Sequence, residues 1–97
     1  MIIQIGVRFL GTFQKLSGQK QIQLKLEEPV TVRIIITKLT ESFSSDFKQV
    51  LIDSDLDDPR PKALIIINGK EISALQGLET KVKDSEEIVL IPMVHGG

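Results

Sequence analysis

The last ten residues constrain the fold of this chain more than any other stretch. Residues 88–91, Ile-Val-Leu-Ile, form a continuous apolar run, which is typical of a short strand buried on both faces. Because Pro92 has no amide hydrogen, strand pairing is predicted to end there. Gly96 and Gly97 lack Cβ atoms, so this end of the backbone passes through gaps that exclude other residues. The pattern predicts a core strand followed by a flexible tail, 92–97, that carries a carboxylate. For the tail alone, a frayed terminus without a role is an equally good interpretation.

The composition is that of one small globular domain. The chain has 97 residues, of which 41% are hydrophobic, and its net charge is −1. We therefore expect a single domain, 1–97, with no field of either sign to attract nucleic acid or a membrane surface. The chain has no Trp or Tyr and only four Phe, which is few for a surface on which bases stack. These features predict no direct binding to nucleic acid or membrane.

The absence of cysteine excludes thiol nucleophiles, disulfides and thiolate metal sites. The N-terminal residues lack the basic region and apolar segment of a signal peptide. No apolar run approaches the ~20 residues that a membrane span needs. A cytoplasmic location is predicted.

Two periodic stretches near the N-terminus predict a β-hairpin. Apolar residues alternate with others over 3–9 and again over 21–27. Between them, a connecting loop punctuated by glycine contains Phe13 and Leu16, which are expected to fold back against the edge of the core.

A helix is predicted after Glu28-Pro29, with Thr31 as its N-cap. The apolar residues recur at helical spacing: Val32, Ile35, Ile36, Leu39 and Phe43. Three consecutive β-branched residues, 34–36, make a strand the competing interpretation. The helix is expected to end at residues 44–46, and residues 47–51 are expected to form one short helical turn.

Residues 53–58 hold four aspartates, and Asp53-x-Asp55-x-Asp57 is similar to the opening of a calcium loop. Asp58 stands where such a loop needs glycine, and Leu64 where it needs glutamate. We therefore reject calcium binding and predict a solvated loop.

The second half of the chain reads as three strands joined by turns. Residues 63–67 form an apolar run typical of a central strand, Asn68-Gly69 predicts a tight turn, and residues 70–72 predict a short edge strand. A compact turn around Leu75, Leu78 and Val82 precedes the final strand. The predicted class is α+β: a mixed sheet of four to five strands with one main helix across one face. If the first and last strands are central neighbours, the tail leaves from the middle of the sheet.

Four stretches of the sequence form a set of motifs: Val7-x-Phe9 with Leu16-x-Gly18, Asn68-Gly69, Asp84-Ser85-Glu86-Glu87-Ile88 and Pro92-Met93-Val94-His95-Gly96-Gly97. In these stretches the chain resembles the MoaD-type and ThiS-type sulfur carriers and the eukaryotic ubiquitin-related modifier. The chain departs from the family pattern in three places. Met93 replaces a second proline, Ser85 replaces a turn glycine, and residues 46–61 make a longer loop than in a compact MoaD.

The resemblance implies a ubiquitin-like β-grasp fold and a reactive terminus. The Gly97 carboxylate, next to Gly96, would be adenylated by a partner that uses ATP with Mg and then converted to a thiocarboxylate. The residues agree with a carrier rather than an enzyme: there is no cysteine, no Gly-x-x-x-x-Gly-Lys loop and only one histidine. We expect no cofactor or metal on this chain itself.

Pro92, Met93, Val94 and His95 are predicted to be recognition residues that direct the tail into a partner. His95 has the pKa range of a general base, but no acid partner stands nearby in the sequence, so a recognition or solvent-exposed role is preferred. The expected partners are an adenylyltransferase of the ubiquitin-activating type and a sulfur donor. Further candidates are a molybdopterin synthase large subunit, a tRNA-thiolating enzyme and target-protein lysines.

Three hypotheses remain open at this point. The first is a sulfur carrier and ubiquitin-like modifier. The second is the dedicated small subunit of molybdopterin synthase, which a complex that survives gel filtration would favour. The third is a non-covalent ubiquitin-like binding module, which loss of Gly96 and Gly97 would leave functional.

Overall fold

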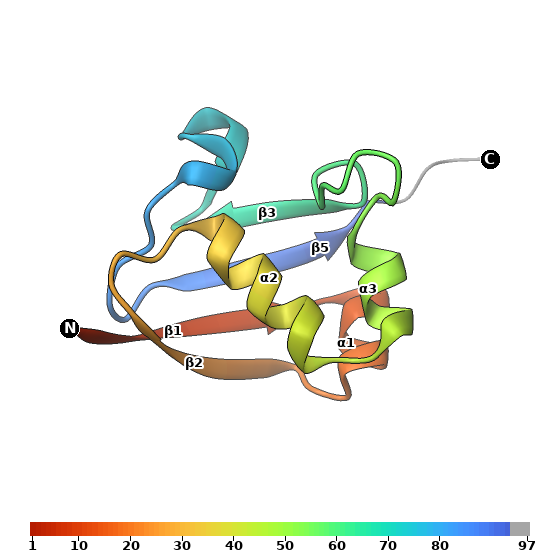
Figure 1. The fold of residues 1–97 in the computed structure, drawn as a ribbon, viewed down its shortest axis with the longest axis horizontal. Helices are drawn as coiled ribbons and strands as arrows, with labels where there is room; N and C mark the ends of the chain where they lie inside the picture. Colours follow the sequence, from red (N-terminus) through yellow and green to blue (C-terminus); the bar gives the residue numbers. More distant parts are fainter. Residues whose placement is uncertain (94–97) are drawn as a thin grey trace.

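The computed structural model describes residues 1–93 and contains a five-stranded mixed sheet in the order β2-β1-β5-β3-β4 (Figure 1). The strands are β1 (Ile2–Phe9), β2 (Gln21–Glu27), β3 (Ala63–Ile67), β4 (Lys70–Glu71) and β5 (Glu87–Pro92). β1 pairs in parallel with β5, and the other neighbouring strands pair antiparallel. The predicted hairpin of the first two strands and the central place of the last strand are confirmed.

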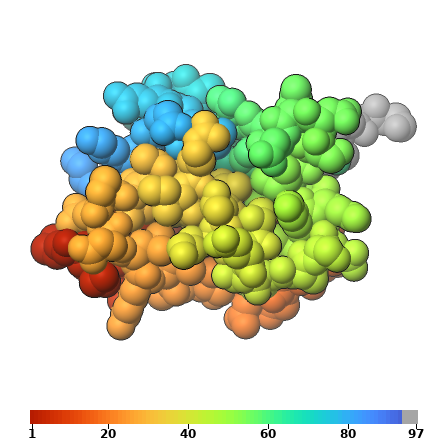
Figure 2. Space-filling view, viewed as in Figure 1, coloured from red at the N-terminus to blue at the C-terminus, as the bar shows by residue number. Residues whose placement is uncertain are grey.

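Three α-helices and two short 3-10 turns connect the strands. They are α1 (Gly11–Ser17), α2 (Val32–Ser42), α3 (Ser45–Leu51), η1 (Ile72–Ala74) and η2 (Gly77–Glu79). α2 crosses one face of the sheet, while α1 and α3 lie at the end toward which β5 runs (Figure 1). Side chains of α2, α3 and the loop after α3 cover most of this face in the space-filling view (Figure 2).

α2 is the predicted main helix, and it forms despite its β-branched residues. The Thr31 hydroxyl accepts a hydrogen bond from the Ile34 amide at 3.3 Å, as an N-cap does. Val32, Ile35, Ile36 and Leu39 are buried on the side that faces the sheet. Burial of this stripe outweighs the small helix penalty of β-branching, which is at most about 0.7 kcal/mol per residue.

The prediction of a loop between the first two strands is wrong, because residues 11–17 form α1. The helix ends at Gly18, which has φ of 72° and donates its amide to the Gln14 carbonyl. Phe13 is fully buried, as predicted, and its ring lies 5.9 Å from that of Phe47. Tertiary contacts of one aromatic side chain thus order a segment whose polar residues and glycines read as a connection.

α3 is longer than the single predicted turn. Ser44, expected to end the preceding helix, caps α3 by accepting the Phe47 amide at 3.2 Å. Phe47 is fully buried and meets Phe9 edge to face, with ring centroids 5.7 Å apart. The end of β1 is therefore packed against both short helices.

The prediction that residues 88–91 are buried on both faces is wrong, and the apolar run of residues 63–67 is not fully buried either. In β5, Ile88 and Leu90 are fully buried, whereas Val89 and Ile91 are half-buried. In β3, burial also alternates, and Leu64 is 37% exposed. The reason is that the core fills one face of the sheet only, so successive side chains meet different surroundings.

The turns that follow β3 agree with the prediction from the sequence. Asn68 and Gly69 join β3 to β4, with Ile67 paired to Lys70. Leu78 and Val82 are buried beneath the 3-10 turns, while Leu75 stays 38% exposed. None of the helices in residues 1–93 has the length and apolar character required to cross a membrane.

The difference between the two sheet faces predicts unequal stability losses. Leu90→Ala removes a fully buried side chain and is expected to lower the free energy of unfolding by about 2–5 kcal/mol. Leu64→Ala, on the adjacent strand but on the exposed face, is the matched control and should lower it by about 1 kcal/mol or less. Urea unfolding measures both values. Equal losses would contradict this division of the sheet into a core face and an exposed face.

Candidate functional site at the end of the central strand

The predicted site residues follow directly from the central strand. Pro92 is the last residue of β5, and Met93 comes next with 41% of its surface exposed. Val94, His95, Gly96 and Gly97 lie outside the described residues, so their predicted roles stay predictions. The structure therefore describes the root of the predicted tail.

β5 and its pairing with β3 end at Pro92, as predicted, although one further hydrogen bond follows. Pro92 pairs with Ala63, and the Met93 amide donates to the Lys62 carbonyl at 2.9 Å. In an antiparallel ladder, hydrogen-bonded pairs of residues alternate with pairs that share no hydrogen bond. Met93 and Lys62 are hydrogen-bonded, so the preceding pair, Ala63–Pro92, is of the second kind and needs no amide hydrogen from proline. β1 has already ended at Phe9 on the other side of β5. Neither β3 nor β1 therefore requires an amide hydrogen from Pro92.

The start of α1 lies against the last residues of β5. Leu10 donates its amide to the Leu90 carbonyl at 3.2 Å, which continues the contact of the two strands beyond Phe9. Gly11 follows with φ of 54°, and a Cβ atom there would lie 2.9 Å from Cγ of Pro92. The Pro92 ring therefore packs directly on the backbone of Gly11, where no other residue fits without displacement.

A shallow cleft surrounds the root of the tail. It is lined by Gly11, Thr12, Gln49, Val50, Lys62, Pro92 and Met93. Sequence reasoning had singled out only Pro92 and Met93 of this set. Gly11 stood in the sequence as a turn signal after a strand, and nothing marked Lys62, because its contribution is a backbone carbonyl.

The exposed sheet face is polar over β2 and β1 and apolar over β3 and β5. Glu87 pairs with Arg8 at 3.3 Å and accepts a hydrogen bond from Gln21 at 2.7 Å. The apolar half consists of Leu64, Ile66, Val89 and Ile91, which cross-strand pairing brings together. This face continues toward the cleft at the tail root, since Ile91 precedes Pro92.

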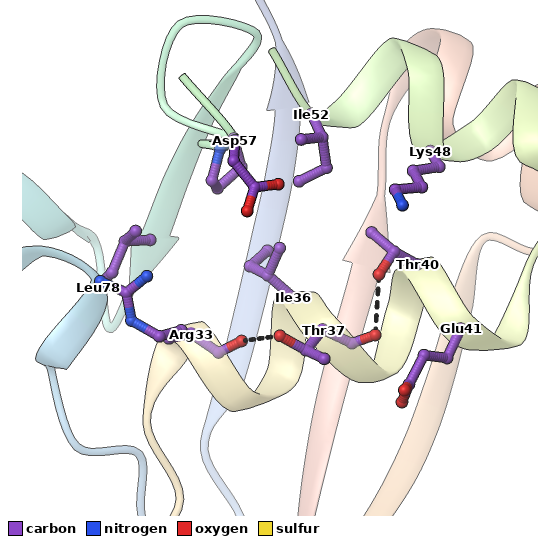
Figure 3. A pocket seen from close by; sticks show the side chains of 10 residues that line it. Arg33, Ile36, Thr37, Thr40, Glu41, Lys48, Ile52, Asp57 and Leu78 are labelled. Carbon is purple, nitrogen blue, oxygen red and sulfur yellow. Dashed lines mark hydrogen bonds between the residues drawn. The ribbon is translucent and has the colours of Figure 1, made fainter. Parts of the chain in front are cut away.

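A second cleft lies between α2, α3 and the loop that follows α3 (Figure 3). Its hydroxyls are used within α2: Thr37 donates to the Arg33 carbonyl at 3.0 Å and Thr40 to the Thr37 carbonyl at 2.9 Å. Arg33 is paired with Glu79 at 2.7 Å. Among residues 1–93, no cluster of three or more His, Asp or Glu side chains is placed to hold a metal ion. This cleft contains none of the predicted site residues.

The acidic loop that leads to Lys62 is held by its own side chains. The Asp53 carboxylate accepts the amides of Asp55 and Leu56, each at 3.0 Å. Asp58 forms an ion pair with Arg60 at 2.5 Å. The hydrogen bond from Arg60 holds the pKa of Asp58 below its usual value. The carboxylates thus serve the loop itself, whose other end continues into β3.

Solved structures of similar shape define the class of protein. The solution structure of small archaeal modifier protein 1 from Methanosarcina acetivorans matches with a TM-score of 0.83 and 27% identity, over 100% of this chain and 99% of that chain. The fold is accordingly a ubiquitin-like β-grasp, as the sequence predicted.

The family follows from comparison of sequences. The model of the Urm1 (Ubiquitin related modifier) family matches residues 4–97, and the chain belongs to that family of ubiquitin-like modifiers and sulfur carriers. Small archaeal modifier protein 3 of Haloferax volcanii is 25% identical over 98% of this chain and 100% of its own length. A putative sulfur carrier protein of Archaeoglobus fulgidus is 32% identical over 72% of this chain and 77% of its own.

The Asp58–Arg60 pair makes the stability contribution of the loop sensitive to pH. Because the pKa of Asp58 is lower in the folded than in the unfolded chain, its contribution is present well above pH 3.8 and is lost as the pH falls through the folded-state pKa. Asp58→Asn should lower the free energy of unfolding by about 0.5–1 kcal/mol at pH 7. The difference from wild type should shrink at pH 3.

Chemical unfolding at several pH values measures this difference. Asp55→Asn, in the same loop, is the matched control and should show a smaller effect at pH 7. A difference for Asp58→Asn that is the same at pH 7 and pH 3 would contradict the role given to the pair.

Proposed function

We propose that this protein carries sulfur on its C-terminal residue and does not itself catalyse the transfer. An activating partner that binds ATP with Mg adenylates the Gly97 carboxylate. The acyl-adenylate is then converted to a thiocarboxylate, whose sulfur passes to an acceptor such as a transfer RNA or a molybdopterin precursor. The same activated carbonyl also accepts a lysine amine, which would attach the protein to a target through an isopeptide bond.

Each step balances without a cofactor on this chain. A carboxylate oxygen of Gly97 attacks the α-phosphorus of ATP, and pyrophosphate leaves. A sulfur nucleophile at the oxidation level of hydrosulfide then attacks the acyl carbon, and AMP leaves with the carboxylate oxygen. Activation is required because a free carboxylate is a poor electrophile, and phosphorylation at oxygen supplies the leaving group.

The observation that carries this proposal is the family match, which extends through Gly97 and includes the terminal Gly96-Gly97 pair. The geometry supports it as well. β5 lies between β1 and β3 and ends at Pro92, so the terminal residues follow a strand that is paired on both sides as far as Leu90. His95, Val94, Met93 and Pro92 are the residues that a partner would read on the way to the carboxylate.

The length of the segment limits how the partner approaches. From Met93 to Gly97 there are four residues, which span at most about 14 Å when fully extended. The reacting centre of the partner must therefore come within this distance of the tail root. The surface around Met93 would then lie against the mouth of the partner's active site.

Intact mass spectrometry tests the proposal. The protein is incubated with the activating enzyme of its own organism, ATP, Mg and a sulfide source. We expect a gain equal to sulfur replacing one oxygen, dependent on ATP and abolished by removal of Gly97. An unchanged mass, with the enzyme shown to be active on another carrier, would contradict the proposal and favour a non-covalent binding module.

A further inference from the structure

The root of the tail is held from two sides by backbone groups that lie far apart in the sequence. Lys62, before β3, accepts the Met93 amide at 2.9 Å, and Gly11, at the start of α1, supports the Pro92 ring. We call Gly11, Lys62, Pro92 and Met93 the tail clasp. We infer that the tail clasp fixes the direction of the chain at Met93, and that Gly11 is a positioning residue for activation of Gly97. This inference rests on the proposed function.

Gly11 meets two separate requirements at this position. Its φ of 54° lies in the left-handed region, where residues with a Cβ are strained. A Cβ would also lie 2.9 Å from Cγ and 3.5 Å from Cδ of Pro92, and the first distance is too short for a normal contact. Because the pyrrolidine ring fixes φ of Pro92, the ring cannot swing away by a simple rotamer change.

Of the two sides of the contact between Gly11 and Pro92, α1 is the less movable. α1 is fixed through Phe13, which is fully buried and packs on Phe47, and through the Leu10 amide, which bonds to the Leu90 carbonyl at 3.2 Å. Pro92 is the last residue of β5, and Met93 follows it. Beyond the Ala63–Pro92 pair they are held by the hydrogen bond from the Met93 amide to the Lys62 carbonyl. A Cβ at position 11 is therefore expected to displace the strand end rather than the helix.

Such a displacement affects activation because the segment that joins Met93 to Gly97 is short. Only three residues separate Met93 from Gly97, so a shift of the root moves the carboxylate relative to a domain docked on its partner. Misplacement of a reacting group by about 1 Å can lower a rate by about 100-fold. Binding of the domain surface would be less affected, since the substitution adds one methyl group to an otherwise unchanged surface.

Gly18 supplies a matched control at the other end of the same helix. Its φ is 72°, but a Cβ there would meet nothing within 4 Å. Gly18→Ala therefore introduces comparable backbone strain without a contact to the tail. Any effect that Gly11→Ala shows beyond that of Gly18→Ala comes from the contact with Pro92.

The experiment compares ATP-dependent activation of four proteins by the same activating enzyme: wild type, Gly11→Ala, Gly18→Ala and the double variant Gly11→Ala with Pro92→Ala. For Gly11→Ala we expect kcat to fall about 10- to 100-fold with KM nearly unchanged. Gly18→Ala should retain the wild-type kcat, although its Tm falls. Pro92→Ala alone is a fifth protein and supplies the reference for the double variant, because Pro92 is itself a predicted recognition residue. The double variant lacks Cγ at position 92, so its kcat should be close to that of Pro92→Ala.

A structural readout is independent of the enzyme. In the ¹⁵N-¹H spectrum, the Met93 amide signal should shift in Gly11→Ala, whereas the double variant should show nearly the same Met93 signal as Pro92→Ala alone. Equal kcat for Gly11→Ala and Gly18→Ala, or no change at Met93, would overturn the inference while leaving the proposed function intact. Failure of the wild-type protein to be activated would instead overturn the proposed function and the positioning role with it.

Discussion

The parallel pairing of β1 with β5 is the contact on which the rest of the structure depends. It runs from Gly6–Glu87 to Phe9–Leu90 and joins the first strand of the chain to the last. Parallel neighbours need a long crossover, and here α2 and β3 lie within that crossover. Because β5 is bounded by β1 on one side and β3 on the other, the C-terminal residues start from the interior of the sheet. The segment that we propose is offered to another protein thus follows a strand with a neighbour on each side.

On the part of the surface that the structure describes, the polar side chains discussed above bond to nearby groups of the domain and do not form a reaction centre. The hydroxyls beside the helical cleft bond to the backbone of α2, and the aspartates of residues 53–58 bond within their own loop. The proposed chemistry therefore resides in the terminal carboxylate, and the domain contributes position. The Phe9, Phe13 and Phe47 cluster supports this by fixing α1 beside the end of β5. In this account the tail clasp connects the hydrophobic core to the reactive end.

Local patterns predicted most of the fold, since each depends on a period that the sequence displays. Alternation gave β1 and β2, the helical stripe from Val32 to Leu39 gave α2, and Asn68-Gly69 gave the turn into β4. The failures are features that distant contacts decide. α1 forms because Phe13 packs on Phe47, and burial alternates along β5 because the core fills only one face of the sheet. The sequence predicted a function for the terminal residues, whereas nothing in it marked Gly11, because the close approach of Gly11 to Pro92 is visible only in the structure.

The central claim is that β5 holds the root of the tail as part of the sheet, and hydrogen exchange at the Met93 amide tests it most directly. This amide donates to the Lys62 carbonyl at 2.9 Å, one residue beyond the last paired position of β5. Our account predicts that the wild-type Met93 amide is protected to an extent similar to the amides inside β5. Exchange of Met93 at the rate of an unstructured chain, while the β5 amides stay protected, would show that the sheet releases the chain at Pro92 and would contradict the account.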